Sequence, residues 1–342
     1  MLSAAGPGPF HNLSKLYLAS IAGFRSAPYS AGRSIVLSIF CGHAASKLED
    51  IVQTAIQKRM AVLCLTEHMT RHRQDFYPEE EQTHDEASLA KLYDDFYVEA
   101  RRLQKSYAGQ ISIFVGFEGE WIRAESLALI QDLLTKYPVD VWLGSVHHVH
   151  TYPIDYDHEL YYKAREVAGG TDERIFEDYF DSQLSLLQAL QPPLVGHFDL
   201  IRLKSDDPER SLKTWPGVWE KALRNLKYIA EYGGVLELNS SSLRKGMTEM
   251  YPQVEVCQTF LELGGRFTLS DDSHGVAQVG LNYAKTLACV EKAGIKQLVR
   301  LSPADGSEKD KSKGSVVGVP HMRWTSVAVE DLRRHEFWQS TA

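Results

Sequence analysis

Histidines and carboxylates follow six short apolar runs in this sequence. The runs begin at Ala61, Ile111, Val139, Leu194, Val235 and Arg266, and each has the pattern of a buried strand. The polar residues at their carboxyl ends are Glu67 and His68; Glu118; His147 and His148; His197 and Asp199; Asn239 with three serines; and Asp271, Asp272 and His274. Imidazole and carboxylate without thiolate suit zinc, iron or manganese, and one carboxylate can bridge two metals. The pattern therefore predicts a multi-metal hydrolase, although a single histidine at a strand end is more often structural.

Segments with a helical pattern separate these strands, and the predicted helices must position the strand ends. They cover residues 47–59, 87–107, 126–136, 173–190, 219–232 and 254–263, and a closing helix is expected over 324–338. Strands that alternate with helices of this length pair in parallel. Ligands at every carboxyl end favour a barrel, whose active sites lie on that face, over an open sheet with one switch point. The prediction is an α/β barrel with its parallel strands as neighbours.

The bulk composition excludes several classes of partner. The formal net charge of -8 at pH 7 argues against nucleic acid. No apolar run reaches the ~18 residues that a membrane helix needs. The four cysteines, at positions 41, 64, 257 and 289, have no CxxC spacing, which favours free thiols in a reducing compartment. We therefore expect a cytoplasmic protein without a nucleic-acid or membrane partner, and the oligomeric state stays open.

The first 39 residues differ from the rest. No Asp or Glu occurs before Glu49, whereas Lys15, Arg25 and Arg33 do. A mitochondrial transit peptide has this character, but an altered exon or gene model explains it as well and is favoured by a motif discussed below. We expect an atypical, poorly ordered segment over residues 1–39 and a single barrel domain over residues 40–342.

Seven segments together resemble the polymerase-and-histidinol-phosphatase (PHP) superfamily. They are FCGHA (40–44), LTEHM (65–69), GFEGEW (116–121), GSVHH (144–148), GHFDL (196–200), LELNSS (236–241) and SDDSH (270–274). The sequence is most similar to the monofunctional histidinol-phosphate phosphatase branch of fungal type, from Phe40 to the carboxyl terminus. Each motif is weak alone, but their order and combination are specific. The resemblance implies a distorted TIM-like (β/α)7 barrel with three divalent metal ions, of zinc, iron or manganese.

The resemblance also implies roles for the strand-end residues. Glu118 would bridge two metals, and the other implied ligands are His147 and His197 on the second metal, Asp272 on the first, and His43, His68 and His274 on the third. Glu67 should lie near this cluster. The implied reaction is hydrolysis of L-histidinol phosphate, a small-molecule phosphate ester, in histidine biosynthesis. Glu118, Asp272 and His148 would be catalytic, with His148 an acid, an orienting residue or a structural one.

Three arginines are candidate phosphate clamps because a guanidinium can bond a phosphate in bidentate fashion. They are Arg71, Arg202 and Arg244, each close to a ligand motif, and a surface ion pair is the alternative for each. Two other functions stay open for the chain as a whole. One is a different metal phosphoesterase or nuclease of the superfamily, and the other is a non-catalytic binding protein.

One family motif is missing. Family members carry an H-x-H pair just before the segment that matches Phe40, and counting back without a gap places it at Ser34 and Val36. Neither side chain can replace an imidazole, so the first metal would keep only Glu118 and Asp272. We therefore predict that this chain binds the first metal weakly and is a weak or inactive phosphatase. The missing pair is also the reason to suspect an altered amino-terminal exon.

Overall fold

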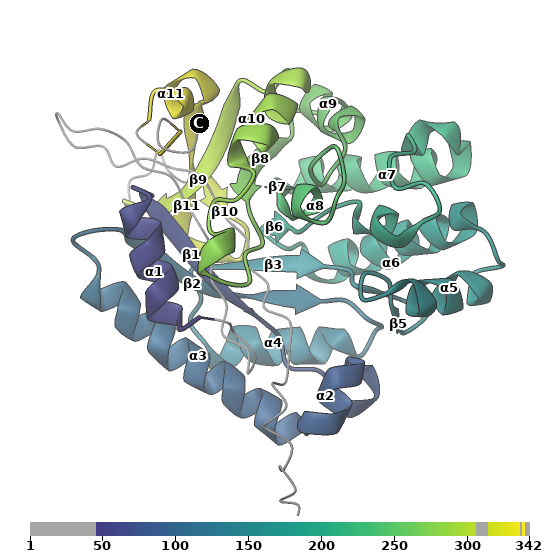
Figure 1. The fold of residues 1–342 in the computed structure, drawn as a ribbon, viewed down its shortest axis with the longest axis horizontal. Helices are drawn as coiled ribbons and strands as arrows, with labels where there is room; N and C mark the ends of the chain where they lie inside the picture. Colours follow the sequence, from purple (N-terminus) through teal and green to yellow (C-terminus); the bar gives the residue numbers. More distant parts are fainter. Residues whose placement is uncertain (1–45, 306–313, 336, 339–342) are drawn as a thin grey trace, which may run out of the picture.

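A curled parallel sheet of six strands forms a half-barrel at the centre of the molecule (Figure 1). The computed structural model describes residues 46–305, 314–335 and 337–338. The strand order is β1-β2-β3-β6-β7-β8 and every pair is parallel, which confirms the six predicted strands as parallel neighbours. Their bounds are β1 (Val62–His68), β2 (Ser112–Glu120), β3 (Val141–Ser145), β6 (Leu194–Val195), β7 (Val235–Asn239) and β8 (Arg266–Ser270).

Helices connect these strands, as the sequence predicts. The longer ones are α1 (Leu48–Gln57), α3 (Glu86–Ser106), α4 (Ser126–Lys136), α5 (His158–Val167), α6 (Asp172–Leu190), α7 (Pro216–Tyr232), α9 (Val254–Glu262) and α10 (Tyr283–Lys292). Helix α3 illustrates why its residues form a helix. Asp85 accepts a hydrogen bond from the Ser88 backbone N–H at 2.8 Å and so caps the first turn. Tyr93, Phe96 and Leu103 then recur at helical spacing and are buried.

Shorter elements complete the chain. They are α2 (Pro78–Thr83), the hairpin of β4 (His148–Val149) and β5 (Tyr152–Pro153), α8 (Ser241–Arg244) and α11 (Val329–Arg333). Short 3-10 helices cover Arg73–Asp75, Leu200–Lys204, Leu212–Thr214 and Val276–Gln278.

An antiparallel sheet lies beside the barrel and corrects the expectation for the tail. Its order is β10 (Ser315–Val316), β11 (Val319–Ala328) and β9 (Gln297–Pro303). The closing helix expected over 324–338 is wrong in its first part, because Trp324 lies in β11 and pairs with Leu301 of β9. Met322 and Trp324 are both buried while Arg323 between them is less so, the alternation of a strand with one covered face. The helix starts only at Val329.

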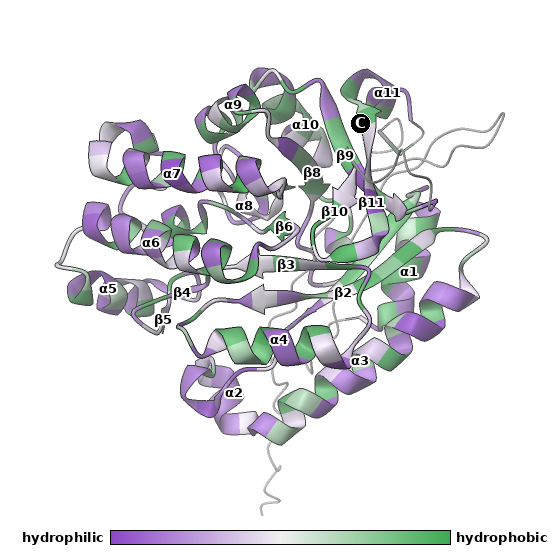
Figure 2. Ribbon diagram, turned by 180° about the vertical axis from the view of Figure 1, so that it is seen from behind, coloured by the Kyte–Doolittle hydropathy of each residue, from purple (hydrophilic) through white to green (hydrophobic). Residues whose placement is uncertain are grey.

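The core lies between the strands and the helices that cover them. Leu63, Cys64 and Leu65 of β1 point alternately to the two faces of the sheet and are all fully buried, as expected for parallel strands covered on both faces. In Figure 2 the arrowheads of β2 and β3 are pale to purple, where these strands end in polar residues and glycine, and α2 is mostly purple and so hydrophilic. Strands β2 and β3 approach so closely that a Cβ on Gly116 would lie 1.7 Å from the Val141 carbonyl oxygen, so only glycine fits there. No described helix combines the length and apolar composition that crossing a membrane requires.

Candidate metal centre

Three side chains from different strands meet at the carboxyl end of the sheet. Glu118 lies on β2, His147 follows β3 and His197 follows β6. The His197 Nε2 lies 3.1 Å from the Glu118 Oε1 and 3.0 Å from the His147 Nε2. One ligand atom from each residue lies within 4.8 Å of the other two, and all three residues are buried. Of the predicted ligands, these three form the tightest group in the part of the chain that the structure describes.

The electrostatics of this trio suit a cation. Burial lowers the pKa of His147 to about 3, so its ring is neutral near pH 7. Burial alone would raise the pKa of Glu118, but the hydrogen bond with His197 and the charges of nearby histidines lower it to about 2. Burial opposes a charge on His197 too, yet its bond with Glu118 raises its pKa to about 9. His197 is therefore protonated near pH 7 and releases that proton when a metal binds; the ionised carboxylate and the two facing imidazoles then form a donor set that fits a divalent metal.

A glycine leaves room for the trio. Gly196 directly precedes His197, and a Cβ there would lie 2.4 Å from the Ser145 Oγ. The same Cβ would lie 3.6 Å from the Glu118 Oε1 and from the Glu237 Oε2. Glu237 also accepts a hydrogen bond from the His197 backbone N–H at 2.7 Å, which fixes the start of this loop. The G-H pair of the GHFDL motif therefore combines a ligand with the space that it needs.

His68 lies beside the trio and brings a further carboxylate with it. It pairs in register with Glu118, and its Nδ1 lies 3.9 Å from the Glu118 Oε2. The same Nδ1 lies 2.5 Å from Glu120 Oε1. Sequence reasoning assigned no role to Glu120, although its position two residues after Glu118 places both on one face of β2. Glu67 is buried on the opposite face of β1, and its Oε1 accepts a hydrogen bond from the His68 N–H at 3.0 Å.

The β8 side of the site holds Asp272 and His274. Asp272 is buried, has a left-handed φ of 47°, and its charge contributes to the raised pKa of His197. Burial raises the pKa of Asp272, and Glu118 adds to the rise. The His274 Nδ1 donates to the Asp272 carbonyl oxygen at 2.8 Å, and its side chain is 19% exposed. Asp272 thus faces the trio, whereas His274 lies on the rim. His43, Ser34 and Val36 lie outside the described residues.

His148 differs from its neighbour His147. Its ring lies 5.3 Å from that of Tyr77, and neither ring nitrogen has a hydrogen-bond partner among the described residues. Burial lowers its pKa to about 4, so the ring is neutral near pH 7. A buried imidazole with two unsatisfied nitrogens is costly unless a ligand or water meets it, which agrees with a place in the site.

The three predicted phosphate clamps all contact protein acceptors. Arg71 bonds the carboxylates of Glu80 and Glu120, Arg202 bonds Asp199 and the Pro208 carbonyl, and Arg244 bonds the carbonyls of Asp271 and Asp272. Arg71 and Arg202 are almost fully buried. A phosphate contact from any of them requires an exchange of partner, so this role stays a prediction.

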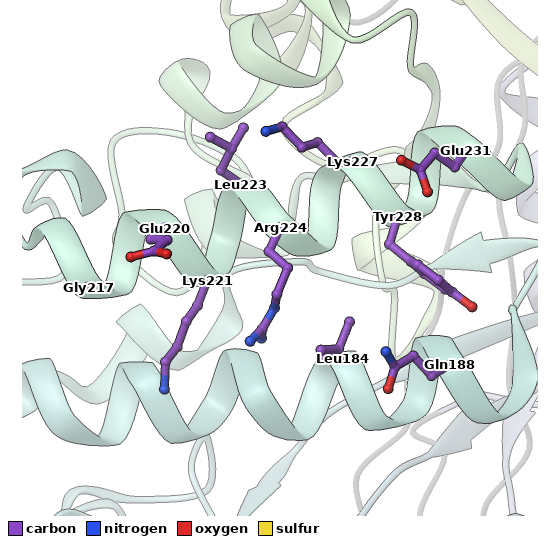
Figure 3. Close-up of a pocket in the computed structure, with 10 residues that line it drawn as sticks. All are labelled: Leu184, Gln188, Gly217, Glu220, Lys221, Leu223, Arg224, Lys227, Tyr228 and Glu231. Carbon is purple, nitrogen blue, oxygen red and sulfur yellow. The ribbon is translucent and has the colours of Figure 1, made fainter.

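A separate hollow lies between α6 and α7 (Figure 3). It has a volume of 640 Å³ and none of the predicted site residues lines it. Leu184 and Gln188 come from α6, while Lys221 and Arg224 reach across from α7 and pair with Asp181. Two of its cations, Lys221 and Arg224, are thus paired within the helix pair.

Comparisons with known proteins agree with the geometry. A model of the PHP domain matches residues 36–241. This chain belongs to the PHP domain family. PHP relatives include a probable histidinol-phosphatase of Schizosaccharomyces pombe, 46% identical over 261 residues, with 76% of this chain and 85% of the relative covered. The histidinol-phosphatase of Saccharomyces cerevisiae is 33% identical over 279 residues, covering 72% and 83%.

A solved structure shares the fold. The histidinol phosphate phosphatase of Lactococcus lactis, crystallised with zinc, L-histidinol and phosphate, superimposes with a TM-score of 0.60 at 21% identity. The match covers 77% of this chain and 95% of that one. This likeness confirms the predicted fold class, a distorted TIM-like barrel.

Proposed function

We propose that this chain is a metal-dependent histidinol-phosphate phosphatase, which hydrolyses L-histidinol phosphate to L-histidinol and phosphate in histidine biosynthesis. One observation carries the proposal: the buried trio of Glu118, His147 and His197 at the carboxyl end of the barrel. The trio occurs in a chain that is 46% identical to a probable histidinol-phosphatase. We place the enzyme in the cytoplasm and the activity in one barrel domain, residues 40–342.

The proposed metal ligands extend the trio. They are His43, His68, Glu118, His147, His197, Asp272 and His274, for three ions of zinc, iron or manganese. A divalent ion bound there supplies a water of pKa ~7 as a source of hydroxide. The chain's own contribution is a neutral His147, an ionised Glu118 and an Asp272 whose charge faces them.

Substrate charge also fits this end of the barrel. Besides Glu118 of the trio, the carboxylates of Glu120, Glu237 and Asp272 are buried at this end of the barrel. A surplus of carboxylates attracts the ammonium and imidazolium groups of histidinol phosphate, while the phosphate needs cations. Arg244 is the most accessible of the three predicted clamps, since it is only partly buried and contacts carbonyls rather than carboxylates.

A catalytically impaired chain is the second candidate, favoured by one observation. Ser34 and Val36 occupy the positions where the family carries two histidines, so the first metal has fewer ligands here. In this form the chain would bind two metals and bind substrate but turn it over slowly, or act as a binding protein.

Phosphate release from L-histidinol phosphate, measured with added zinc or manganese, tests the function. We expect release that a chelator abolishes and that Glu118→Gln abolishes as well. Parallel assays with other phosphate monoesters identify the substrate. Hydrolysis of those esters without hydrolysis of L-histidinol phosphate would leave a PHP phosphoesterase of different specificity, and metal binding without hydrolysis of any ester would favour the impaired chain.

A further inference from the structure

Glu120 is fully buried at the carboxyl end of β2, in a position where a lone carboxylate would be costly. Its Oε1 lies 2.5 Å from the His68 Nδ1 and 2.5 Å from an Arg71 Nη2. Its Oε2 lies 3.9 Å from the His147 Nδ1. Glu120 therefore lies on the Nδ1 side of two histidines, whereas Glu118, two residues earlier on the same face, meets His147 through Nε2.

The two carboxylates of the GFEGEW segment have different surroundings, which indicates different roles. Glu118 shares a small space with the ring nitrogens that form the trio. Glu120 holds the Nδ1 of His68 at 2.5 Å, closer than the Glu118 Oε2, which lies 3.9 Å from the same nitrogen. A carboxylate that accepts a proton from one imidazole nitrogen fixes the tautomer and ring direction, and leaves the other nitrogen with its lone pair for a metal. Resting on the proposed metal-dependent function, we propose that Glu120 is a positioning residue that orients His68 for metal binding.

Arg71 anchors Glu120 in turn. Its guanidinium bonds Glu120 through one Nη and Glu80 through the other, and lies 4.9 Å from the centre of the Tyr77 ring. Glu80 also accepts a hydrogen bond from the Tyr77 backbone N–H at 2.9 Å. The chain of contacts therefore runs from α2 through Arg71 and Glu120 to His68. In this role Arg71 fixes the ligand geometry rather than contacting phosphate.

Two isosteric variants separate positioning from structural support. Glu120→Gln and Glu80→Gln each remove one carboxylate charge from Arg71, but only Glu120 contacts a histidine. Zinc affinity, measured by competition with a chromophoric chelator, and metal content at equal protein concentration are the readouts. We expect Glu120→Gln to weaken zinc binding by about 10–100-fold, the usual effect of losing such a partner. Glu80→Gln should weaken zinc binding less than Glu120→Gln does, because Glu80 reaches His68 only through Arg71 and Glu120.

A double-mutant cycle then tests the route through His68. In a His68→Gln background, Glu120→Gln should cause no further loss of zinc affinity. An unchanged affinity in Glu120→Gln, an equal loss in Glu80→Gln, or an additive loss in the double variant would each overturn the proposal. If Glu120→Gln does not fold, Arg71→Lys decides, because one ammonium cannot bridge Glu80 and Glu120 as the guanidinium does. Weaker zinc binding in that variant supports the proposal and unchanged binding overturns it.

Failure of this inference is distinguishable from failure of the proposed function. A chain that binds zinc, loses affinity in Glu120→Gln and yet hydrolyses no L-histidinol phosphate would refute the function and keep the positioning role. A chain that hydrolyses the substrate with undiminished zinc affinity in Glu120→Gln would do the reverse.

Discussion

The two sides of the candidate metal centre are built differently. On the side of β2, β3 and β6, Glu118, His147 and His197 contact one another and are buried. On the β8 side, the Asp272 carbonyl oxygen accepts hydrogen bonds from the side chains of Arg244 and His274, and the His274 side chain is 19% exposed. Strands β2, β3 and β6 are the middle strands of the half-barrel, whereas β8 lies at the end of the strand order (Figure 1).

This contrast shows how neighbours in a sheet preorganise a site. Strand β3 is bonded on both sides, to β2 and β6, so its carboxyl end can be placed only where both partners allow. Among the described residues β8 has one parallel partner, β7, and its following loop depends on Arg244 for two hydrogen bonds. Among the described residues, the end of β3 is therefore held by two neighbouring strands, whereas the loop after β8 follows a strand with one such neighbour and is also held by the polar contacts of Arg244.

The largest expected effect is that of Glu118→Gln. This change keeps the shape of the side chain but removes the one charge that both histidines of the trio share. We expect kcat/KM for L-histidinol phosphate to fall by more than about 100-fold, because losing a direct ligand should exceed the loss of an outer partner. Zinc content should fall in parallel. Asp178→Asn, an exposed carboxylate paired with His150, is the control and should change neither quantity. Full zinc content in Glu118→Gln would contradict the central role of the trio.

Asp272→Asn tests the β8 side in the same way. Asparagine tolerates a left-handed backbone, so the φ of 47° should persist while the charge is lost. We expect kcat/KM to fall by about 10–100-fold, less than for Glu118→Gln, because Asp272 faces the trio without joining its contacts. Steady-state kinetics and zinc content of both variants give the comparison. Equal losses would show that the two sides act as one unit and that the contrast drawn above has no functional meaning.

Restoring the missing histidine pair should strengthen metal binding on the β8 side of the site. We expect a chain with Ser34→His and Val36→His, in a segment 34–39 rewritten as HSHSGQ, to bind more metal and release phosphate at least about 10-fold faster. The matched control carries ASASGQ in the same segment, which separates the imidazoles from the change of backbone. If the unmodified chain already matches the repaired one at equal protein and metal concentration, our prediction for the first metal is wrong.

The strands could be predicted because each is a short apolar run that ends at polar residues. Glu118, His147 and His197 each follow such a run, and parallel strands bring those ends to one edge. The role of Glu120 was not predictable, since spacing shows which face it shares with Glu118 but not that His68 and Arg71 meet it there. The tail failed for a similar reason: Trp324 fits a helical pattern locally, and only its pairing with Leu301 makes it a strand residue.

The contacts of Arg244 illustrate a further limit of the sequence. Its position after three serines indicates a phosphate clamp, but its guanidinium bonds the carbonyl oxygens of Asp271 and Asp272. Every residue carries a carbonyl, so no residue pattern identifies this partner. A role in fixing the β8 loop could be found only in three dimensions.

The smallest effect is expected from a single methyl group on the packed side. In Gly196→Ala the new Cβ would lie 2.4 Å from the Ser145 Oγ, so either the hydroxyl or the His197 loop must shift. We expect a loss of about 1–3 kcal/mol in the free energy of unfolding, as for other overpacked sites, visible as a lower Tm. Gly109→Ala is the matched control, because a Cβ there meets nothing within 4 Å.

Removing the obstructing atom should reverse this loss. Combined with Ser145→Ala, Gly196→Ala should recover most of the lost stability, because the clash is with the serine hydroxyl and the next atoms lie 3.6 Å away. Zinc affinity of the double variant then separates two causes. If stability and affinity recover together, the packing of Gly196 places His197 for the metal. If stability recovers while affinity stays low, the Ser145 hydroxyl itself contributes to the site, and packing alone does not explain why the middle of the sheet holds its ligands so tightly.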